Sequence, residues 1–264
     1  MSIFDSHCHP QFPQYDKDRE EMLKRAKDAG VGMICVGTDL EMSKKGIELS
    51  QKHENMWATV GLHPNDIPED IIIGAYAHEI IHPKVVAIGE VGLDYYRTPE
   101  LEKQENQKKV FEQFIDLASN TGKPLILHCR DSAKGTAGKV HEDMISILNF
   151  RFKILNSLLR GVAHSFTGNI KEAKRYLELG FYLGFNGIIT FARQYDEVVK
   201  YVPIENILLE TDAPYLTPDP YRGHRNEPAY VIEVAKRISE LKNISFEKVV
   251  EQTMQNTRNL FKID

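Results

Sequence analysis

Short runs of apolar and β-branched residues recur along the whole chain, and most of them end in a polar residue or a glycine. Such runs are typical of strands that are covered by helices. Successive runs are separated by about 30 residues, which is the length of one strand, one helix and their loops. The eight predicted strands are Ile3–His9, Met33–Thr38, Met56–Leu62, Val85–Glu90, Leu125–His128, Gly161–Ser165, Tyr182–Asn186 and Ile207–Asp212.

The segments between the strands repeat their apolar residues at helical spacing. One of them places a single apolar stripe at Val110, Phe111, Phe114, Ile115, Leu117 and Ala118. Gly122 and Pro124 follow this stripe and predict the end of its helix, and Phe246–Phe261 predicts a closing helix. Eight strands that alternate with helices favour a (β/α)8 TIM barrel over a doubly wound sheet. Because no linker-like tract interrupts the pattern, we expect one domain over residues 1–264.

Composition excludes several classes of protein. The 264 residues are 42% hydrophobic and 27% charged, which is too apolar for a disordered chain and typical of a globular one. The formal net charge of −5 gives no general positive field for a long duplex or an anionic membrane. Cys8, Cys35 and Cys129 lie in apolar stretches with no disulfide-like spacing, and no run is long enough to cross a membrane. We therefore expect a cytoplasmic protein, and nothing indicates an obligate protein partner.

The polar residues that end the predicted strands are the candidates for chemistry. In a parallel barrel the carboxyl ends of all strands meet at one mouth, where the active site lies. Six of the residues at these ends are of types that bind metals: His7, His9, Glu90, His128, His164 and Asp212. His7 and His9 share one face of their strand, since side chains two residues apart point the same way.

Each candidate taken alone has a structural explanation. A strand-end histidine is commonly a hydrogen-bonded structural residue, Glu90 could pair with an arginine or lysine, and Glu210 would share a face with Asp212, so that only one of them need bind metal. Six such residues at one end of one barrel favour a metal site. Glu90 has two carboxylate oxygens and could bridge two cations. The two groups of ligands would then be His7, His9 and Asp212, and His128 and His164.

Several short motifs give the chain a family resemblance. They are Asp5-Ser6-His7-Cys8-His9, Gly61-Leu62-His63-Pro64, Gly89-Glu90-Val91-Gly92-Leu93-Asp94-Tyr95, His128-Cys129-Arg130-Asp131, His164-Ser165-Phe166-Thr167-Gly168, Glu210-Thr211-Asp212-Ala213-Pro214-Tyr215-Leu216 and Arg225-Asn226-Glu227-Pro228. With them the chain resembles the TatD family of metal-dependent deoxyribonucleases, which are amidohydrolase-like barrel enzymes.

The resemblance implies a TIM barrel and hydrolysis of phosphodiester bonds in DNA, commonly as a 3′ to 5′ exonuclease on single strands. It also implies two divalent metal ions, one held by His7, His9, Glu90 and Asp212 and the other by Glu90, His128 and His164. Magnesium is the metal that the resemblance favours, while the histidine nitrogens would also suit Mn, Zn, Co or Ni. The segment Ser132–Lys139 predicts a longer loop than the family usually has, which could alter access of the substrate.

The hypothesis for the reaction is hydrolysis assisted by two metals, with Asp212 as the catalytic base and Glu90 fixing the spacing of the cations. Further predicted substrate contacts are His63, Arg130 and Arg225 for phosphate and Tyr95 for stacking on bases. Weaker candidates are Arg97, Arg222 and Tyr96. The alternatives are a structural hydrogen bond for His63, solvated surface charge for the arginines and core packing for the two tyrosines.

Two other functions stay open. The same metals could attack an ester or amide, and the version nearest to this resemblance removes D-amino acids from mischarged tRNA. A third hypothesis is a barrel without activity that keeps metal for stability or binds a partner. The intact ligand set disfavours it. Assays of phosphodiester and ester substrates with one preparation would separate these readings.

Overall fold

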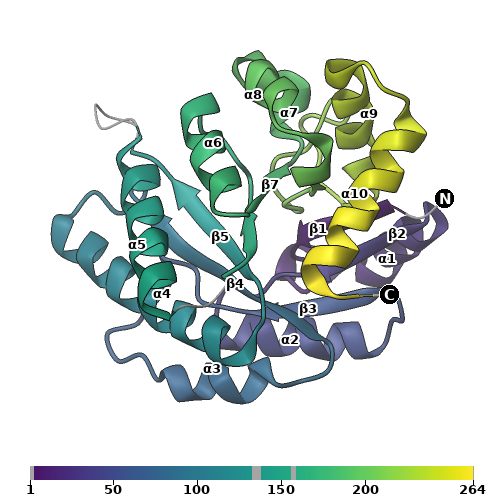
Figure 1. Ribbon diagram of the computed structural model, residues 1–264. Coiled ribbons are helices and arrows are strands. Elements are labelled where there is room, and N and C mark those ends of the chain that lie inside the picture. The colour runs from purple at the N-terminus through teal and green to yellow at the C-terminus, as the bar shows by residue number, and fades with distance from the viewer. Residues whose placement is uncertain (1–2, 133–137, 156–158, 264) are drawn as a thin grey trace.

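The computed structural model describes residues 3–132, 138–155 and 159–263. Eight parallel strands follow one another in chain order around a nearly closed barrel (Figure 1). Their bounds are β1 (Ile3–Cys8), β2 (Val31–Cys35), β3 (Met56–Val60), β4 (Val85–Asp94), β5 (Leu125–Arg130), β6 (Gly161–Ala163), β7 (Tyr182–Phe185) and β8 (Ile207–Leu209). Each predicted strand has its counterpart here, and the predicted (β/α)8 TIM barrel is confirmed.

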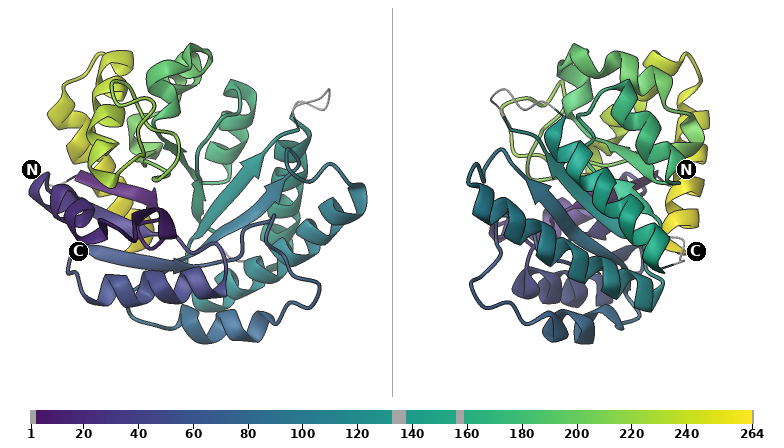
Figure 2. Two further views of the ribbon diagram at one scale, coloured as in Figure 1. Left: turned by 180° about the vertical axis from the view of Figure 1, so that it is seen from behind. Right: turned by 60° about the vertical axis from the view of Figure 1, so that its left-hand side comes forward.

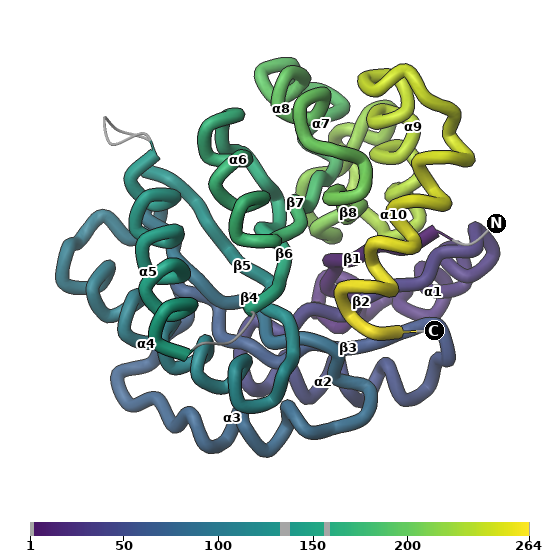
Figure 3. Tube along the Cα trace, viewed as in Figure 1, coloured from purple at the N-terminus to yellow at the C-terminus, as the bar shows by residue number. Residues whose placement is uncertain are grey.

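Helices cover the outside of the strands, as the ribbon and the tube both show (Figures 2 and 3). They are α1 (Arg19–Asp28), α2 (Leu40–Gln51), α3 (Ile73–Ile80), α4 (Leu101–Thr121), α5 (Lys139–Leu155), α6 (Ile170–Glu178), α7 (Ile188–Phe191), α8 (Asp196–Tyr201), α9 (Val231–Lys242) and α10 (Phe246–Phe261). Short 3-10 turns lie at Pro13–Tyr15, Arg193–Tyr195, Ile204–Asn206 and Pro228–Tyr230. The helix expected around the Val110 stripe is α4, and Gly122 ends it with a left-handed φ of 65°. The predicted closing helix is α10.

The first and last strands close the barrel through backbone hydrogen bonds at the mouth. The Asp212 amide donates to the His7 carbonyl at 2.8 Å, and the His9 amide donates to the Ala213 carbonyl at 2.8 Å. These bonds join residues about 200 positions apart in the chain. Closure therefore brings the first predicted ligands next to the last one.

One hydrophobic cluster fills the inside of the barrel. Every strand contributes a side chain to it, namely Phe4, Ile34, Trp57, Val86, Ile126, Val162, Tyr182 and Leu208. Side chains from all eight strands can meet in one place only in the barrel interior. Leu260 and Phe261 from the end of α10 join this cluster and close its bottom.

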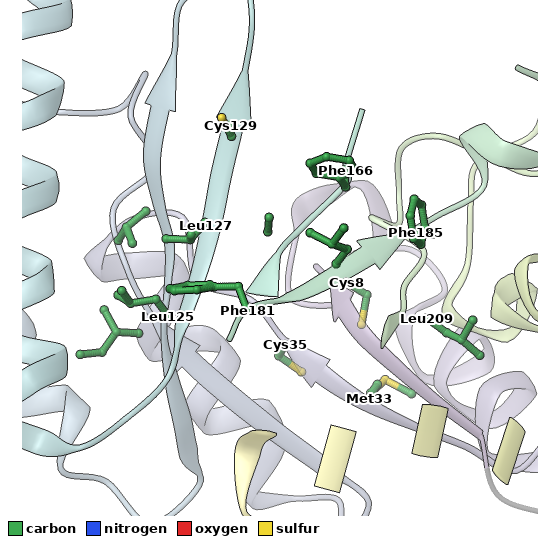
Figure 4. Packing of buried hydrophobic residues seen from close by; sticks show 14 of the residues in the cluster. Cys8, Met33, Cys35, Leu125, Leu127, Cys129, Phe166, Phe181, Phe185 and Leu209 are labelled. Atoms are coloured by element: carbon green, nitrogen blue, oxygen red, sulfur yellow. The ribbon is translucent and has the colours of Figure 1, made fainter. Parts of the chain in front are cut away.

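A second and larger cluster lies between the strands and the helices. Leu125 and Leu127, the neighbours of Ile126 on β5, belong to it, as do Phe181 and Phe185 around β7 (Figure 4). Alternate residues of a strand therefore serve the two clusters. The residue two positions after an interior side chain points into the barrel again, one layer nearer to the mouth.

Candidate metal centre

Strand periodicity lifts several polar residues above the apolar floor of the barrel. His128 comes two residues after Ile126 on β5, and His164 comes two residues after Val162 on β6. In β1 the register shifts between Asp5 and Cys8, and the imidazole of His7 lies inside the barrel beside Glu90. The carboxyl ends of the strands thus place these side chains in one layer.

His7, His9 and Asp212 form the first group of donors. The two Nε2 atoms of the histidines lie 3.3 Å apart, and Asp212 Oδ1 lies 3.6 Å from that of His7 and 3.4 Å from that of His9. His9 Nδ1 donates to the Val36 carbonyl at 2.9 Å, which fixes the tautomer and leaves Nε2 free to face Asp212. Three atoms that can bind a metal, the two Nε2 atoms and Asp212 Oδ1, therefore lie within 3.6 Å of one another.

Glu90 lies between this group and a second one. Its Oε2 is 3.5 Å from His7 Nε2, whereas its Oε1 is 2.5 Å from His128 Nδ1 and 2.8 Å from His164 Nε2. Burial disfavours a charged imidazole, but the charge of Glu90 together with the hydrogen bonds to Glu90 and to a second carboxylate, Asp94 or Glu210, raises the pKa of both His128 and His164. The Glu90 carboxylate therefore attracts positive charge from both sides.

All six predicted ligands are thus neighbours, and His63 joins them. His63 Nε2 lies 3.9 Å from Glu90 Oε1, and burial together with the charge of His128 lowers the pKa of His63 to about 3. A neutral imidazole can bind a metal through one ring nitrogen and donate a hydrogen bond through the other. His63 lies at the edge of the donor cluster, on the side that opens to the mouth of the barrel.

The donors fit divalent cations. Three groups of side chains place one ligand atom each within 4.8 Å of one another, namely His7, His9 and Glu90; His63, Glu90 and His128; and His7, His164 and Glu210. Buried carboxylates would be costly without positive charge nearby. Imidazole nitrogens mixed with carboxylate oxygens are the ligands of Zn, Mn and similar ions.

Asp94 and Glu210 support two of the histidines, and the sequence analysis did not assign them this role. Asp94 Oδ2 lies 3.3 Å from His128 Nε2, while Asn65 donates to the same oxygen at 2.7 Å. Glu210 Oε1 lies 3.6 Å from His164 Nδ1. Strand alternation places Asp94, four residues after Glu90, on the same face as Glu90. The prediction missed it because the predicted strand ended at Glu90, whereas β4 continues to Asp94.

Glu210 is fully buried, and its neighbour on β7 makes room for it. A Cβ added to Gly184 would lie 2.2 Å from Glu210 Oε2. The Ser165 amide donates to Glu210 Oε1. Asp212 therefore lies among the inner donors, whereas Glu210 lies behind His164, on the outer side of its ring.

A cavity of about 380 Å³ opens above the donors at the mouth of the barrel. Glu90, His128, His164 and Asp212 lie at its base, together with His63. Ser165, Asp212 and Leu216 line the cavity and have left-handed backbones, with φ of 47°, 56° and 52°. Such conformations cost free energy in residues other than glycine and cluster at functional sites.

Two predicted substrate contacts are wrong in their placement. Tyr95 is 1% exposed and its hydroxyl donates to Asp143 at 2.7 Å, so its ring packs in the core. The next residue, Tyr96, is 50% exposed. Arg225 lies outside the cavity, where its guanidinium donates to both oxygens of Asp18 at 2.7 and 2.6 Å.

The other predicted contacts divide between the cavity and its surroundings. His63, Arg97 and Arg130 line the cavity. The Arg222 guanidinium instead stacks on Phe191 at 3.8 Å. Of the predicted loop Ser132–Lys139, residues 133–137 lie outside the described part of the chain, and α5 begins at Lys139.

Comparisons with known proteins all relate this chain to one family of hydrolases. The sequence model of the family described as TatD related DNase matches residues 4–262. The chain is 39% identical to the uncharacterized metal-dependent hydrolase YabD of Bacillus subtilis, over 99% of this chain and 100% of that protein. It is 33% identical to the 3′-5′ ssDNA/RNA exonuclease TatD of Salmonella typhimurium, over 99% of each.

Solved structures show the same architecture. The crystal structure of YjjV, a TatD homolog from Escherichia coli, superposes with a TM-score of 0.86 at 28% identity and covers 99% of this chain and 98% of that one.

Within the described residues, no helix has the length and hydropathy to cross a membrane.

Proposed function

Because the chain belongs to the family of TatD related DNases and is therefore a metal-dependent hydrolase, we propose that it removes nucleotides from the 3′ ends of single-stranded DNA. The observation that carries the proposal is Glu90, whose two oxygens face two separate groups of histidines at the base of the cavity. A carboxylate in that position is suited to bridging two cations. The named exonuclease from Salmonella supports the choice of substrate.

The ligand assignment follows the two groups of donors. His7, His9, Asp212 and Glu90 would hold one cation, and Glu90, His128 and His164 the other. When bound, such cations lower the pKa of water and neutralise the charge of the phosphate oxygens. Asp94, within hydrogen-bond distance of His128, and Glu210, beside His164, would orient these two rings from their outer side.

Asp212 is the proposed base. Burial disfavours its charged form, but the hydrogen bond with His9 and the proximity of His7 outweigh burial and keep its pKa below the usual range. Asp212 is therefore ionised at neutral pH and can accept the proton of the attacking water. The neutral His63 and the cationic Arg130, at the open side of the donors, would bind the scissile phosphate.

Size and charge support a single-stranded end as the substrate. A cavity of about 380 Å³ has the size of a site for one small ligand, such as a single nucleotide, and therefore favours a strand end as the substrate. The net charge of −5 provides no extended surface for a long duplex, so that binding depends on the mouth of the barrel. We also propose a reducing, cytoplasmic compartment, because Cys8, Cys35 and Cys129 are all free and buried.

The experiment uses one single-stranded oligonucleotide labelled at either its 5′ or its 3′ end, with Mg²⁺ or Mn²⁺ and with EDTA. In the 3′ to 5′ direction the 3′ label appears at once as a mononucleotide, while the 5′-labelled strand shortens to a ladder. We expect Asp212→Asn to lower the rate by roughly 10²- to 10⁴-fold, the usual contribution of a general base. The control is Asp70→Asn, which changes an exposed carboxylate in the same way.

Two outcomes would count against the proposal. Absence of shortening with every metal would refute nuclease activity and would move hydrolysis of a carboxylic ester, tested on D-aminoacyl-tRNA, to first place. Equal loss of activity in Asp70→Asn and Asp212→Asn would remove Asp212 from the reaction. An RNA strand of the same sequence shows whether the enzyme accepts a 2′-hydroxyl, as the name of the Salmonella relative suggests for that protein.

A further inference from the structure

The cavity above the donors has two walls of opposite character. Arg97 and Arg130 line it from the ends of β4 and β5. Phe12, Ile188, Tyr215 and Leu216 line it from the segments after β1, β7 and β8. Because the strands follow one another around the barrel in chain order, the ends of β4 and β5 lie across the mouth from those of β8 and β1.

We propose that Phe12, Ile188, Tyr215 and Leu216 form a subsite for the base of the terminal nucleotide, the one that is removed. Arg130, which faces the scissile phosphate, and Arg97 beside it would lie along the part of the strand that is retained. The inference rests on the proposed exonuclease function and adds to it the orientation of the strand and the part of the nucleotide that is recognised. The four residues are called the apolar wall below.

The aromatic part of the apolar wall is prearranged and accessible. The Phe12 ring stacks on His9 with centroids 4.4 Å apart and planes at 17°, and Tyr215 meets Phe12 edge-on with centroids 6.5 Å apart. Tyr215 is 49% exposed, so that its ring is accessible to a ligand in the cavity. Base stacking on aromatic rings tolerates any base sequence, as an exonuclease requires.

The aliphatic part is held in place by a close backbone contact. A Cβ added to Gly187 would lie 2.1 Å from the Leu216 carbonyl oxygen, so only glycine lets these two segments meet. Leu216 itself has a left-handed backbone with φ of 52°. Ile188 follows Gly187, so this contact places Ile188 and Leu216 on the same side of the cavity. Leu216 comes four residues after Asp212 in the chain.

The opposite wall offers free cations. Unlike Arg225, neither Arg97 nor Arg130 forms an ion pair with any residue in the described ranges. The Arg130 guanidinium lies 4.1 Å from the ring of Tyr96, which orients it without neutralising its charge. Unpaired arginines at the mouth are available to phosphate oxygens.

A neighbouring cavity is unsuited to the phosphates. It measures about 650 Å³ and adjoins the first at Thr167. Its lining carries three carboxylates, from Asp131, Glu172 and Glu197, and one lysine, Lys171. The first cavity also has carboxylates in its lining, but it presents two arginines, Arg97 and Arg130, and we therefore place the retained strand along their wall.

The test compares two 5′-labelled strands that differ only at the 3′ terminus, which carries thymidine in one and an abasic tetrahydrofuran residue in the other. The measured quantity is the ratio of kcat/KM for the first cleavage of the two strands. For the unchanged protein we expect the thymidine end to be preferred by roughly 5- to 150-fold, the range for stacking of one base. Tyr215→Ala and Leu216→Ser should each reduce this ratio severalfold, and Tyr215→Phe should preserve it.

Two further variants separate recognition of the base from other effects. Arg130→Gln should lower kcat/KM on both strands and leave the ratio unchanged. Tyr201→Ala, an exposed tyrosine at the end of α8, should leave the ratio and the rates unchanged. A ratio near one in the unchanged protein, or a Tyr215→Ala variant that keeps the full ratio, would overturn the apolar wall while leaving exonuclease activity intact. If neither strand is cleaved, the proposed function itself fails.

Discussion

Asp94 and Glu210 each touch a histidine of the donor cluster without joining its centre. Their carboxylates lie 3.3 Å and 3.6 Å from the outer ring nitrogens of His128 and His164. In metal sites such outer partners fix the tautomer and increase the basicity of the ligand. The two carboxylates therefore control how well the inner nitrogens can bind a cation.

Asp94→Asn and Glu210→Gln should each weaken binding of Mn²⁺ by about 10- to 100-fold, because the amide no longer accepts the outer proton of the histidine in the same way. Isothermal titration calorimetry measures the Kd directly. The exposed Asp70→Asn is again the matched control. Unchanged affinity in both carboxylate variants would refute a supporting role for Asp94 and Glu210.

At the scale of elements, the end of α10 closes the bottom of the barrel. Leu260 and Phe261 are 2% and 3% exposed, and they pack in the same cluster as a side chain from each of the eight strands. The metal donors lie one layer above that cluster. The helix that ends the fold thus supports the floor on which the candidate site rests.

Phe261→Ala should lower the free energy of unfolding by about 3 to 5 kcal/mol, because it removes a buried aromatic ring and leaves a cavity. Urea unfolding followed by circular dichroism measures this change. Phe150→Ala on α5 removes the same ring from a side chain that is 59% exposed, and we expect a change within about 0.5 kcal/mol. Similar losses in the two variants would argue against a role for α10 as the floor.

At the scale of the whole molecule, the cluster of carboxylates couples metal binding to folding. Glu90 and Glu210 are buried, and a cation that binds only the folded chain stabilises it. At a metal concentration of 100 Kd the gain should be about 2.7 kcal/mol for one site. The measurement is Tm with Mn²⁺ and with EDTA, and the gain should be largely lost in Glu90→Gln. An equal rise in that variant would mean that the metal binds elsewhere.

Burial also determines the reactivity of the thiols. Cys8 and Cys35 are fully buried and Cys129 is 8% exposed, and burial raises the pKa of all three thiols. The reactive thiolate is therefore scarce and inaccessible in the folded chain. A chromogenic disulfide reagent should label no thiol in native buffer and three in urea. Rapid labelling of one thiol in native buffer would indicate local opening of its strand.

Periodicity is a local property, and the parts of this protein that depend on it were predictable. The recurring short apolar runs predicted all eight strands, and the repeat at helical spacing predicted α4 and α10. One strand end lies four residues beyond its predicted position, in a strand whose ladder is irregular. In β4 the register shifts between Ile88 and Val91, and the strand runs on to Asp94 beyond the predicted end at Glu90.

The sequence by itself therefore determined the barrel and the gathering of six metal-binding residue types at its mouth, because strand order and alternation assign each strand end to the same side. Only the tertiary structure decided the partners of individual side chains. It placed Tyr95 in the core against Asp143 and paired Arg225 with Asp18, 207 positions away in the chain. It also set Glu210 beside His164, in space left by Gly184. Such contacts depend on where the closed barrel brings distant segments together, which no local pattern records.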